Sequence, residues 1–395
     1  MLRPRNNLLA TCVLALGCVL PSLTRSVRSF GMEGNAGTLR SGNPARSAAS
    51  SGVLGQTVYD RACAACHGSD GRGAPSDRVG FDVPLPDLTD CNFTREPDLD
   101  WFAVTHDGGP ARAFDPMMPA FGDALTEQEI DASIEHVRSF CDEEGWPRGE
   151  LNFPRALVTE KAFPEDEALL IMSVTLEGPP TIEGKLIYEQ RFGRRSQFEV
   201  IVPFGMRERT ASADDKESGW AEGIGDIAFG AKHVVLASRE AEAILSIAGE
   251  VFVPSGDEAD GYGKGYFVGE PFLAYGQGFG DLGFVQLQVG AEVPFDADRP
   301  EEGFGRLALG SSFSEGRFGR TWTPMLEFAA ARELTEGASV SWDYVPQIQI
   351  TLNRRQHLML NLGARIPMTE LDRRPVEAMG YFLWDWFDGG LTDGW

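Results

Sequence analysis

Positive charge is scarce in this chain of 395 residues. Lysine and arginine together number 35, against 59 aspartates and glutamates, and the formal net charge is −24. Because an acidic surface repels the phosphates of nucleic acids and of anionic lipid headgroups, this balance argues against both as partners. Hydrophobic residues make up 42% of the chain and charged residues 24%, which excludes a wholly disordered protein.

Long hydrophobic runs are also lacking. The stretch 8–20 is apolar and follows Arg3 and Arg5. It falls short of the ~20 apolar residues that a spanning helix needs, and a basic start before such a stretch is typical of a signal peptide. We predict a signal peptide over 1–23 and therefore export. A buried N-terminal helix is the alternative, and lipid attachment at Cys18 is a second open possibility.

Changes of composition divide the rest of the chain. Residues 24–51 are rich in Ser, Gly, Ala and Arg without a hydrophobic period, which predicts a flexible linker. Between 51 and 150 there are 20 acidic residues, 7 arginines and no lysine. A glycine-dense region with alternating apolar residues follows. We predict one folded domain over 52–150 and a second over 160–395.

The first domain contains one candidate cofactor-binding motif, Cys63-Ala64-Ala65-Cys66-His67. On one helical turn, cysteines with this spacing can each form a thioether with a haem vinyl group, and His67 can then bind the iron. A redox-active dithiol would need a preceding strand, whereas 57–62 has a helical pattern, and a zinc site would need two further ligands. The motif predicts one covalently bound haem c.

The surroundings of the motif, with Gly55, Tyr59 and the run HGSDGRGAP over 67–75, resemble the class I c-type cytochromes. This family is small, all-helical and binds a single haem. The resemblance implies a C-terminal helix crossing the first one near Gly55 and Tyr59. A capping box from Thr126 to Glu129 marks the start of that helix.

The resemblance also implies two further haem contacts. The second axial ligand of the family is a methionine on a loop before the last helix, and Met118 matches because Pro119 follows it. Met117 and His106 are the alternatives. In the family a proline carbonyl orients the proximal imidazole, and Pro75 stands at the matching place.

Two cysteines remain outside the motif and the signal peptide. In an oxidising compartment such a pair predicts a disulfide between Cys91 and Cys141, and free buried thiols are the alternative.

Strict period-two alternation dominates the second domain. It is clearest in 285–293 and 357–366, and roughly twelve such segments of ~10 residues follow one another, often with aromatic residues at their ends. This pattern predicts an all-β antiparallel, up-and-down barrel of about 12 strands. The alternative is a soluble β-sandwich or antiparallel sheet.

The segment GIGDIAFGAK over 223–232 and the meander pattern resemble outer-membrane β-barrels that act as transporters in aromatic-compound degradation. Trp395 supplies the aromatic C-terminal residue that barrel insertion favours, although 388–394 has a turn-like composition. The resemblance implies contact with outer-membrane lipid and a cytochrome domain in the periplasm.

A haem with protein ligands on both faces has no open position for substrate, which favours electron transfer over catalysis. We therefore predict an electron carrier at the periplasmic face of the outer membrane, tethered by its barrel. Its acidic surface suits a periplasmic or membrane redox partner with a basic patch. A solute-transport barrel with an accessory haem domain and a periplasmic enzyme subunit with a soluble β-domain are the alternatives.

Overall fold

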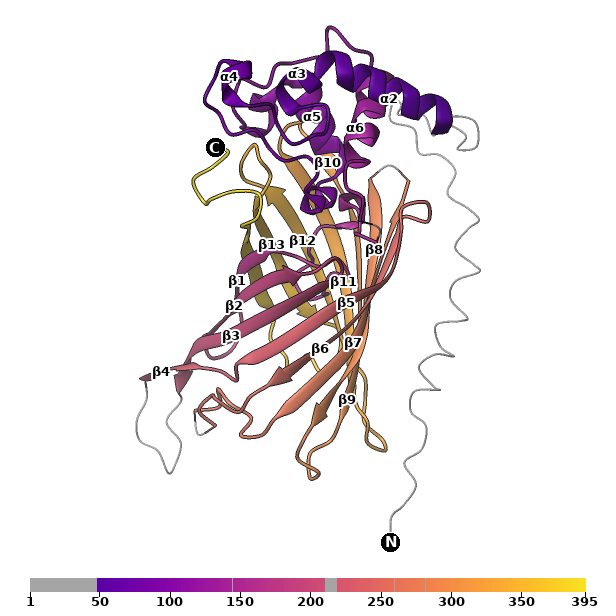
Figure 1. Ribbon diagram of the computed structural model, residues 1–395. Coiled ribbons are helices and arrows are strands. Elements are labelled where there is room, and N and C mark those ends of the chain that lie inside the picture. Colours follow the sequence, from indigo (N-terminus) through magenta and orange to yellow (C-terminus); the bar gives the residue numbers. More distant parts are fainter. Residues whose placement is uncertain (1–47, 144, 210–218, 259, 281) are drawn as a thin grey trace, which may run out of the picture. The chain divides into compact units, whose positions relative to one another are not determined.

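The computed structural model describes residues 48–395 except 144, 210–218, 259 and 281. The predicted signal peptide, Cys18 and most of the predicted linker lie outside the described residues. Residues 48–395 form one compact unit in which helices precede strands along the chain (Figure 1). The predicted all-α domain followed by an antiparallel barrel is confirmed.

The helical part contains two kinds of helix. The α-helices are α2 (Ala48–Ala62), α3 (Ala64–His67), α4 (Ser76–Val79), α5 (Asp98–Asp107) and α6 (Glu127–Arg138). The 3-10 helices are η1 (Cys91–Arg95), η2 (Gly109–Arg112) and η3 (Gly149–Leu151).

Helices α2 and α6 cross where α2 carries a glycine. A Cβ atom at Gly55 would clash with the backbone carbonyl of Ala132, so only glycine permits this approach. One turn later Tyr59 is fully buried, and its ring packs edge-on against the rings of His136 and Phe140. The crossing implied by the family resemblance is therefore formed.

Helix α6 begins at the expected capping box. The Thr126 side chain accepts the Glu129 N–H, and the Glu129 carboxylate accepts the Thr126 N–H at 2.9 Å. Ile130 and Ile134 lie on its buried face. Beyond its end, a disulfide joins Cys141 to Cys91, with 5.0 Å between the Cα atoms.

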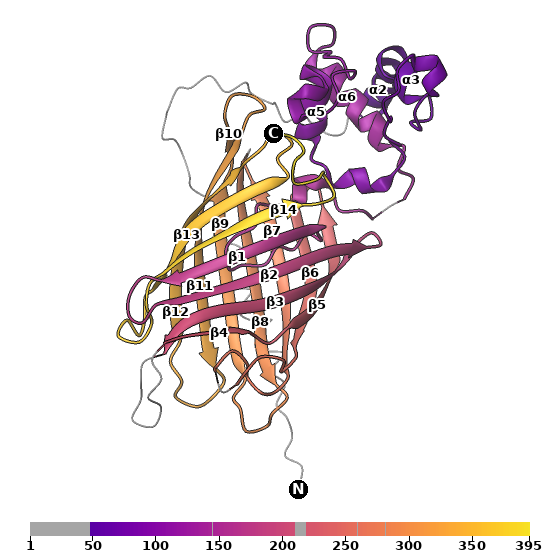
Figure 2. The same cartoon turned by 90° about the vertical axis from the view of Figure 1, so that its left-hand side faces the viewer.

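The β-domain contains strands β1 (Glu167–Thr175), β2 (Thr181–Phe192), β3 (Ser196–Arg209), β4 (Gly219–Ile224), β5 (Ala228–Ser238), β6 (Ala243–Phe252), β7 (Val268–Phe279), β8 (Gly283–Pro294), β9 (Glu302–Ser311), β10 (Phe313–Ser314), β11 (Thr321–Glu333), β12 (Ser341–Thr351), β13 (Leu358–Pro367) and β14 (Glu377–Asp385). Neighbouring strands are antiparallel, as in Figure 2. The short β10 pairs with β11, and β4 pairs with β3 beside the main path.

The sheet closes on itself because β1 pairs with β14 over its whole length, from Glu167 opposite Asp385 to Thr175 opposite Glu377. Without β4 and β10, twelve strands form the ring. Closure leaves no unpaired sheet edge, which is the condition for placing strands in hydrocarbon.

Side chains alternate between the two faces of the barrel wall. On β2, Leu186 and Tyr188 are 51% and 41% exposed, whereas Ile187 and Glu189 are 5% and 0% exposed. On β13, Asn361 is buried and Leu362 is 55% exposed. Apolar residues thus cover the outside and polar residues the inside, as lipid on one side and a polar interior on the other require.

Residues 152–166, here called the luminal segment, connect η3 to β1 and run through the barrel interior. Inward-facing side chains of several strands bind their backbone: Gln286 of β8 donates to the Pro154 carbonyl, Tyr381 of β14 to the Arg155 carbonyl, and Ser246 of β6 to the Ala162 carbonyl, at 2.6–2.8 Å. The Arg155 guanidinium lies 2.9 Å from the carboxylates of both Glu167 and Glu189. The segment therefore lies inside the space that the strands enclose.

Apolar side chains of this segment complete the interior. Phe163 packs with Val234, Ile244 and Phe272, and Leu157 packs in a second cluster near the β1–β14 closure. Phe272 is 5% exposed, so this aromatic side chain of β7 faces the interior and not the outer surface. Among the described residues, no helix is both long and apolar enough to cross a membrane.

Candidate functional site

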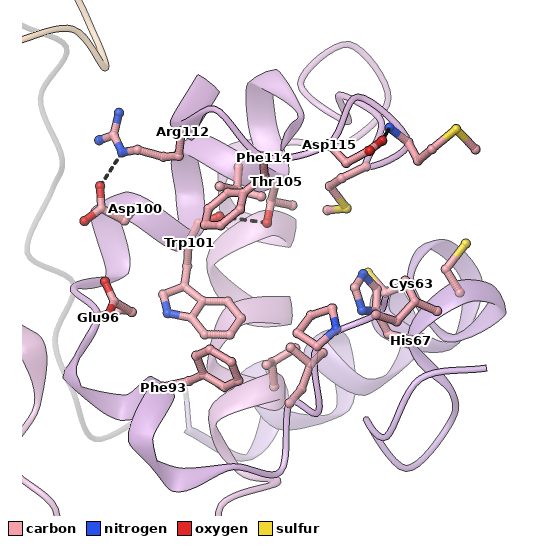
Figure 3. A pocket seen from close by; sticks show the side chains of 18 of the residues that line it. Cys63, His67, Phe93, Glu96, Asp100, Trp101, Thr105, Arg112, Phe114 and Asp115 are labelled. Carbon is pink, nitrogen blue, oxygen red and sulfur yellow. Dashed lines mark hydrogen bonds and ion pairs between the residues drawn. The ribbon is translucent and has the colours of Figure 1, made fainter. Parts of the chain in front are cut away.

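A cavity of about 710 Å³ lies among the helices. Its lining is mostly apolar and comes from α2, α3, residues 81–88, α5, the loop 114–121 and α6. Cys63, Cys66, His67, Met117 and Met118 all lie on its wall (Figure 3 labels Cys63 and His67). The structure therefore brings together the predicted haem-binding residues.

Local hydrogen bonds hold the motif against this cavity. The His67 N–H donates to the Cys63 carbonyl at 2.9 Å, and the Tyr59 hydroxyl donates to the Gly68 carbonyl at 2.7 Å. The chain then turns sharply at Gly71, whose φ of +78° favours glycine and whose missing side chain leaves room for the Phe140 ring. These contacts fix the turn that presents both cysteines and His67 on one side.

The protonation states suit metal binding and thioether formation. Burial lowers the pKa of His67, which favours the neutral imidazole that binds metals. Burial also raises the pKa of the Cys63 thiol to about 11. Cys63 and Cys66 are not joined by a disulfide, so both sulfur atoms are free to form a thioether.

The residues present fit a covalently bound haem. Two thiols on one turn, an adjacent neutral histidine and an apolar cavity supply the attachment, the axial ligand and the low-polarity surroundings of such a group. When bound, the haem supplies an iron that takes up and releases one electron.

The loop 114–121 brings both methionines to the cavity wall. The Gly109 N–H donates to the Met118 carbonyl at 3.0 Å, and Gly109 leaves room for the Asp115 carbonyl, which fixes the loop. Met117 is 48% exposed, whereas Met118 is half-buried. Burial thus favours Met118, and its role as second axial ligand stays a prediction.

His106 does not line the cavity. It lies on α5 rather than on an exposed loop, where its ring stacks on Phe102 and its Nδ1 contacts Asp107. These contacts hold its imidazole outside the cavity that His67 and Met118 line.

The predicted bond between Pro75 and the proximal imidazole is not formed. Helix α4 begins directly after Pro75. The Pro75 carbonyl therefore accepts hydrogen bonds from the N–H groups of Arg78 and Val79, at 2.9 and 3.3 Å. The His67 Nδ1 is buried and has no hydrogen-bond partner among the described residues.

The cavity wall is completed by residues of the barrel, which the sequence did not point to. Arg355 lies on the turn between β12 and β13, and Phe387 and Asp388 follow β14. The Arg95 guanidinium lies over the Phe387 ring at 4.2 Å and forms an ion pair with Asp166 at the end of the luminal segment.

Two acidic residues at this end of the cavity, Glu96 and Asp388, are hydrogen-bonded to each other. Burial raises the pKa of Glu96 to about 7 and holds the pKa of Asp388 well above its usual range. A hydrogen bond between two carboxyl groups requires a proton on one of them; this contact raises the pKa of Asp388 together with burial and works against burial at Glu96.

The comparison with protein families agrees with this geometry. Residues 53–140 match the sequence model of the cytochrome c family. The chain contains a cytochrome c domain. This domain includes the Cys-x-x-Cys-His motif, Met118 and helix α6, and the family implies covalently bound haem c.

The β-domain is similar to channels of known structure. An outer membrane channel from Pseudomonas putida F1 aligns at 14% identity over 57% of this chain and 97% of its own, with a TM-score of 0.39. The KdgM porin aligns at 8% identity over 55% of this chain and 98% of its own, with a TM-score of 0.34. The comparison with curated proteins found no match. The closed barrel itself rests on the strand pairing of this chain.

Proposed function

We propose that this chain is a monohaem c-type cytochrome that carries single electrons at the periplasmic face of the outer membrane, with the barrel as its anchor. The observation that supports it best is the cavity, whose wall holds Cys63, Cys66, His67 and Met118 together. If His67 and Met118 both bind the iron, they would leave no coordination position open to substrate, and electron transfer would be the chemistry that remains.

Two features of the barrel support an anchor. Its outer face is apolar along strands that are mostly 9–14 residues long, as in transmembrane barrels. Its interior holds the luminal segment, whose backbone is bound by side chains of β6, β8 and β14. An interior that holds a bound segment suits an anchor better than an open pore.

Charge points to the kind of redox partner. The net charge of −24 favours a partner that presents lysines and arginines around its own redox centre. Steering between opposite charges depends on ionic strength, so electron transfer between the two should slow as salt is added.

Haem staining after denaturation tests the cofactor. Thioethers survive boiling in detergent, so the wild-type chain should keep its peroxidase stain on a denaturing gel, and a Cys63→Ala/Cys66→Ala variant should lose it. A Cys91→Ser/Cys141→Ser variant is the matched control and should keep the stain. A wild-type chain that loses its stain on boiling contradicts the proposal.

Fractionation and solute flux test the anchor. The chain should sediment with outer membranes, and liposomes that contain it should pass small solutes no faster than empty liposomes. Recovery in the soluble periplasmic fraction would favour the enzyme subunit with a soluble β-domain. Rapid flux through the wild-type chain, with or without haem, would favour the solute-transport barrel.

A further inference from the structure

Two hydrogen-bond donors of the cavity wall lack partners. The indole N–H of Trp101 and the Nε–H of Arg355 are buried, and neither has a hydrogen-bond partner among the described residues. A buried donor without an acceptor costs about 1–3 kcal/mol, so both are placed for an acceptor that the protein itself does not supply.

The two donors belong to the polar end of the cavity. Figure 3 shows Cys63 and His67 at one end and Glu96, Asp100 and Trp101 at the other. The thioethers at the cysteines would fix the vinyl-bearing edge of the haem. Because the propionates lie on the macrocycle edge away from the vinyl groups, they would point toward Trp101.

Arg355 is held in place before any ligand arrives. Its guanidinium donates to the Ala113 carbonyl at 2.9 Å and to the Asp388 carbonyl at 3.2 Å, and lies 4.5 Å from the centre of the Phe114 ring. Its side chain is 17% exposed. These contacts leave the Nε–H as its unpaired donor.

We propose that Arg355 binds a haem propionate together with the indole N–H of Trp101, so that the barrel supplies part of the haem site. An arginine and an indole are suited to this ligand, because a carboxylate accepts charge-assisted hydrogen bonds from the first and a neutral one from the second. The inference rests on the proposed haem site and adds to it a residue more than 200 positions beyond the family match.

The nearby carboxyl groups leave Arg355 available for the propionate. Asp100 is paired with Arg112, and Asp388 shares a proton with Glu96. Asp393 lies 3.8 Å from Nη1 but is half exposed to solvent, where an ion pair is weak. Arg355 is therefore the cation that balances a propionate at this end.

The test is the midpoint potential of the full chain in detergent, measured by redox titration of the haem absorbance. Arg355→Gln should lower the potential, because loss of a cation near the propionate favours the oxidised iron. We expect the reduced-to-oxidised ratio at a fixed potential to fall about tenfold, which is 59 mV for a one-electron couple. Arg355→Lys should restore most of the potential.

A neighbouring residue supplies the matched control. Arg354 carries the same charge on the same turn, but its side chain is exposed and does not line the cavity. Arg354→Gln should leave the potential unchanged. Trp101→Phe should lower it, and the shifts of Trp101→Phe and Arg355→Gln should not add, because both donors bind one group.

Three results would overturn the inference: an unchanged potential in Arg355→Gln, equal shifts in Arg354→Gln and Arg355→Gln, or additive shifts with Trp101→Phe. If Arg355→Gln does not load haem, Trp101→Phe decides: an unchanged potential in that variant would also overturn the inference. A wild-type chain without haem would instead refute the proposed function.

Discussion

Glu327 of β11 offers the sharpest test of the luminal segment. Its carboxylate is fully buried and accepts the backbone N–H groups of Leu157, Val158 and Thr159 at 2.7–3.2 Å. Glu327→Leu keeps a similar volume but removes both acceptor oxygens. Leu157 keeps a second acceptor, the Gln347 side chain at 2.9 Å. The Gln347 amide, which also donates to Glu327, keeps the Val345 carbonyl at 3.5 Å, so the N–H groups of Val158 and Thr159 are the two that lose their partners.

The expected loss of binding free energy of the luminal segment follows from those two N–H groups. Each buried N–H without an acceptor costs about 1–3 kcal/mol, so the segment should be held less tightly by roughly 2–6 kcal/mol. One tenfold change corresponds to about 1.4 kcal/mol. Amide hydrogen exchange at Val158 and Thr159 should therefore speed up roughly 30-fold to 20,000-fold, and solute flux through liposomes should rise with it.

The control makes the same substitution, glutamate to leucine, at another position of β11. Glu333 lies on the same strand, at its exposed end, and Glu333→Leu removes the same charge without touching the luminal segment. Glu327→Gln keeps one acceptor oxygen and should give an intermediate result. Equal exchange rates in Glu327→Leu and wild type would refute the claim that these hydrogen bonds hold the segment.

Three further predictions concern the cytochrome domain. Met118→Ala should abolish the sulfur-to-iron charge-transfer band and lower the potential, whereas Met117→Ala should keep both; the reverse pattern would move the ligand by one residue. Because the pKa of Glu96 is raised to about 7, its stabilising protonated form is lost as the pH rises from about 4.5 through 7. The melting temperature of the haem absorbance should fall over that range in wild type and less in Glu96→Gln; parallel curves would contradict this. Removal of the Cys91–Cys141 bond, which spans 50 residues, should destabilise the domain by up to about 4 kcal/mol in denaturant titrations, and an unchanged midpoint would contradict it.

Local signals in the sequence predicted much of the fold. The alternation over 285–293 and 357–366 corresponds to β8 (Gly283–Pro294) and β13 (Leu358–Pro367), because a wall with one polar and one apolar face imposes period two along every strand. The haem motif is equally local, since its spacing lies within one helical turn. The face of a single residue was harder to predict: Phe272 lies within β7 (Val268–Phe279), two residues before the buried Ala274, and is itself buried.

The contacts between distant parts of the chain could not be predicted. Arg355 meets Ala113 across 242 positions, and Tyr381 meets the Arg155 carbonyl across 226. No period or motif marks such pairs. The luminal segment left one usable signal, because it mixes Arg155 and Lys161 with apolar residues in neither a strand nor a helix pattern, while the following strands place Glu167 and Glu189 inward.

The luminal segment has a mechanical consequence for any opening of the barrel. Its C-terminal end continues directly into β1, and its N-terminal end leads back through η3 to the disulfide-linked cytochrome domain. A folded domain of this size has a radius of gyration of about 12 Å and cannot be drawn through a twelve-stranded ring, so the segment cannot leave by the far mouth. It can retract only toward the helices, as a slack loop. The luminal segment is thus mechanically coupled to the cytochrome domain. Any force that displaces this domain also pulls on the segment inside the barrel.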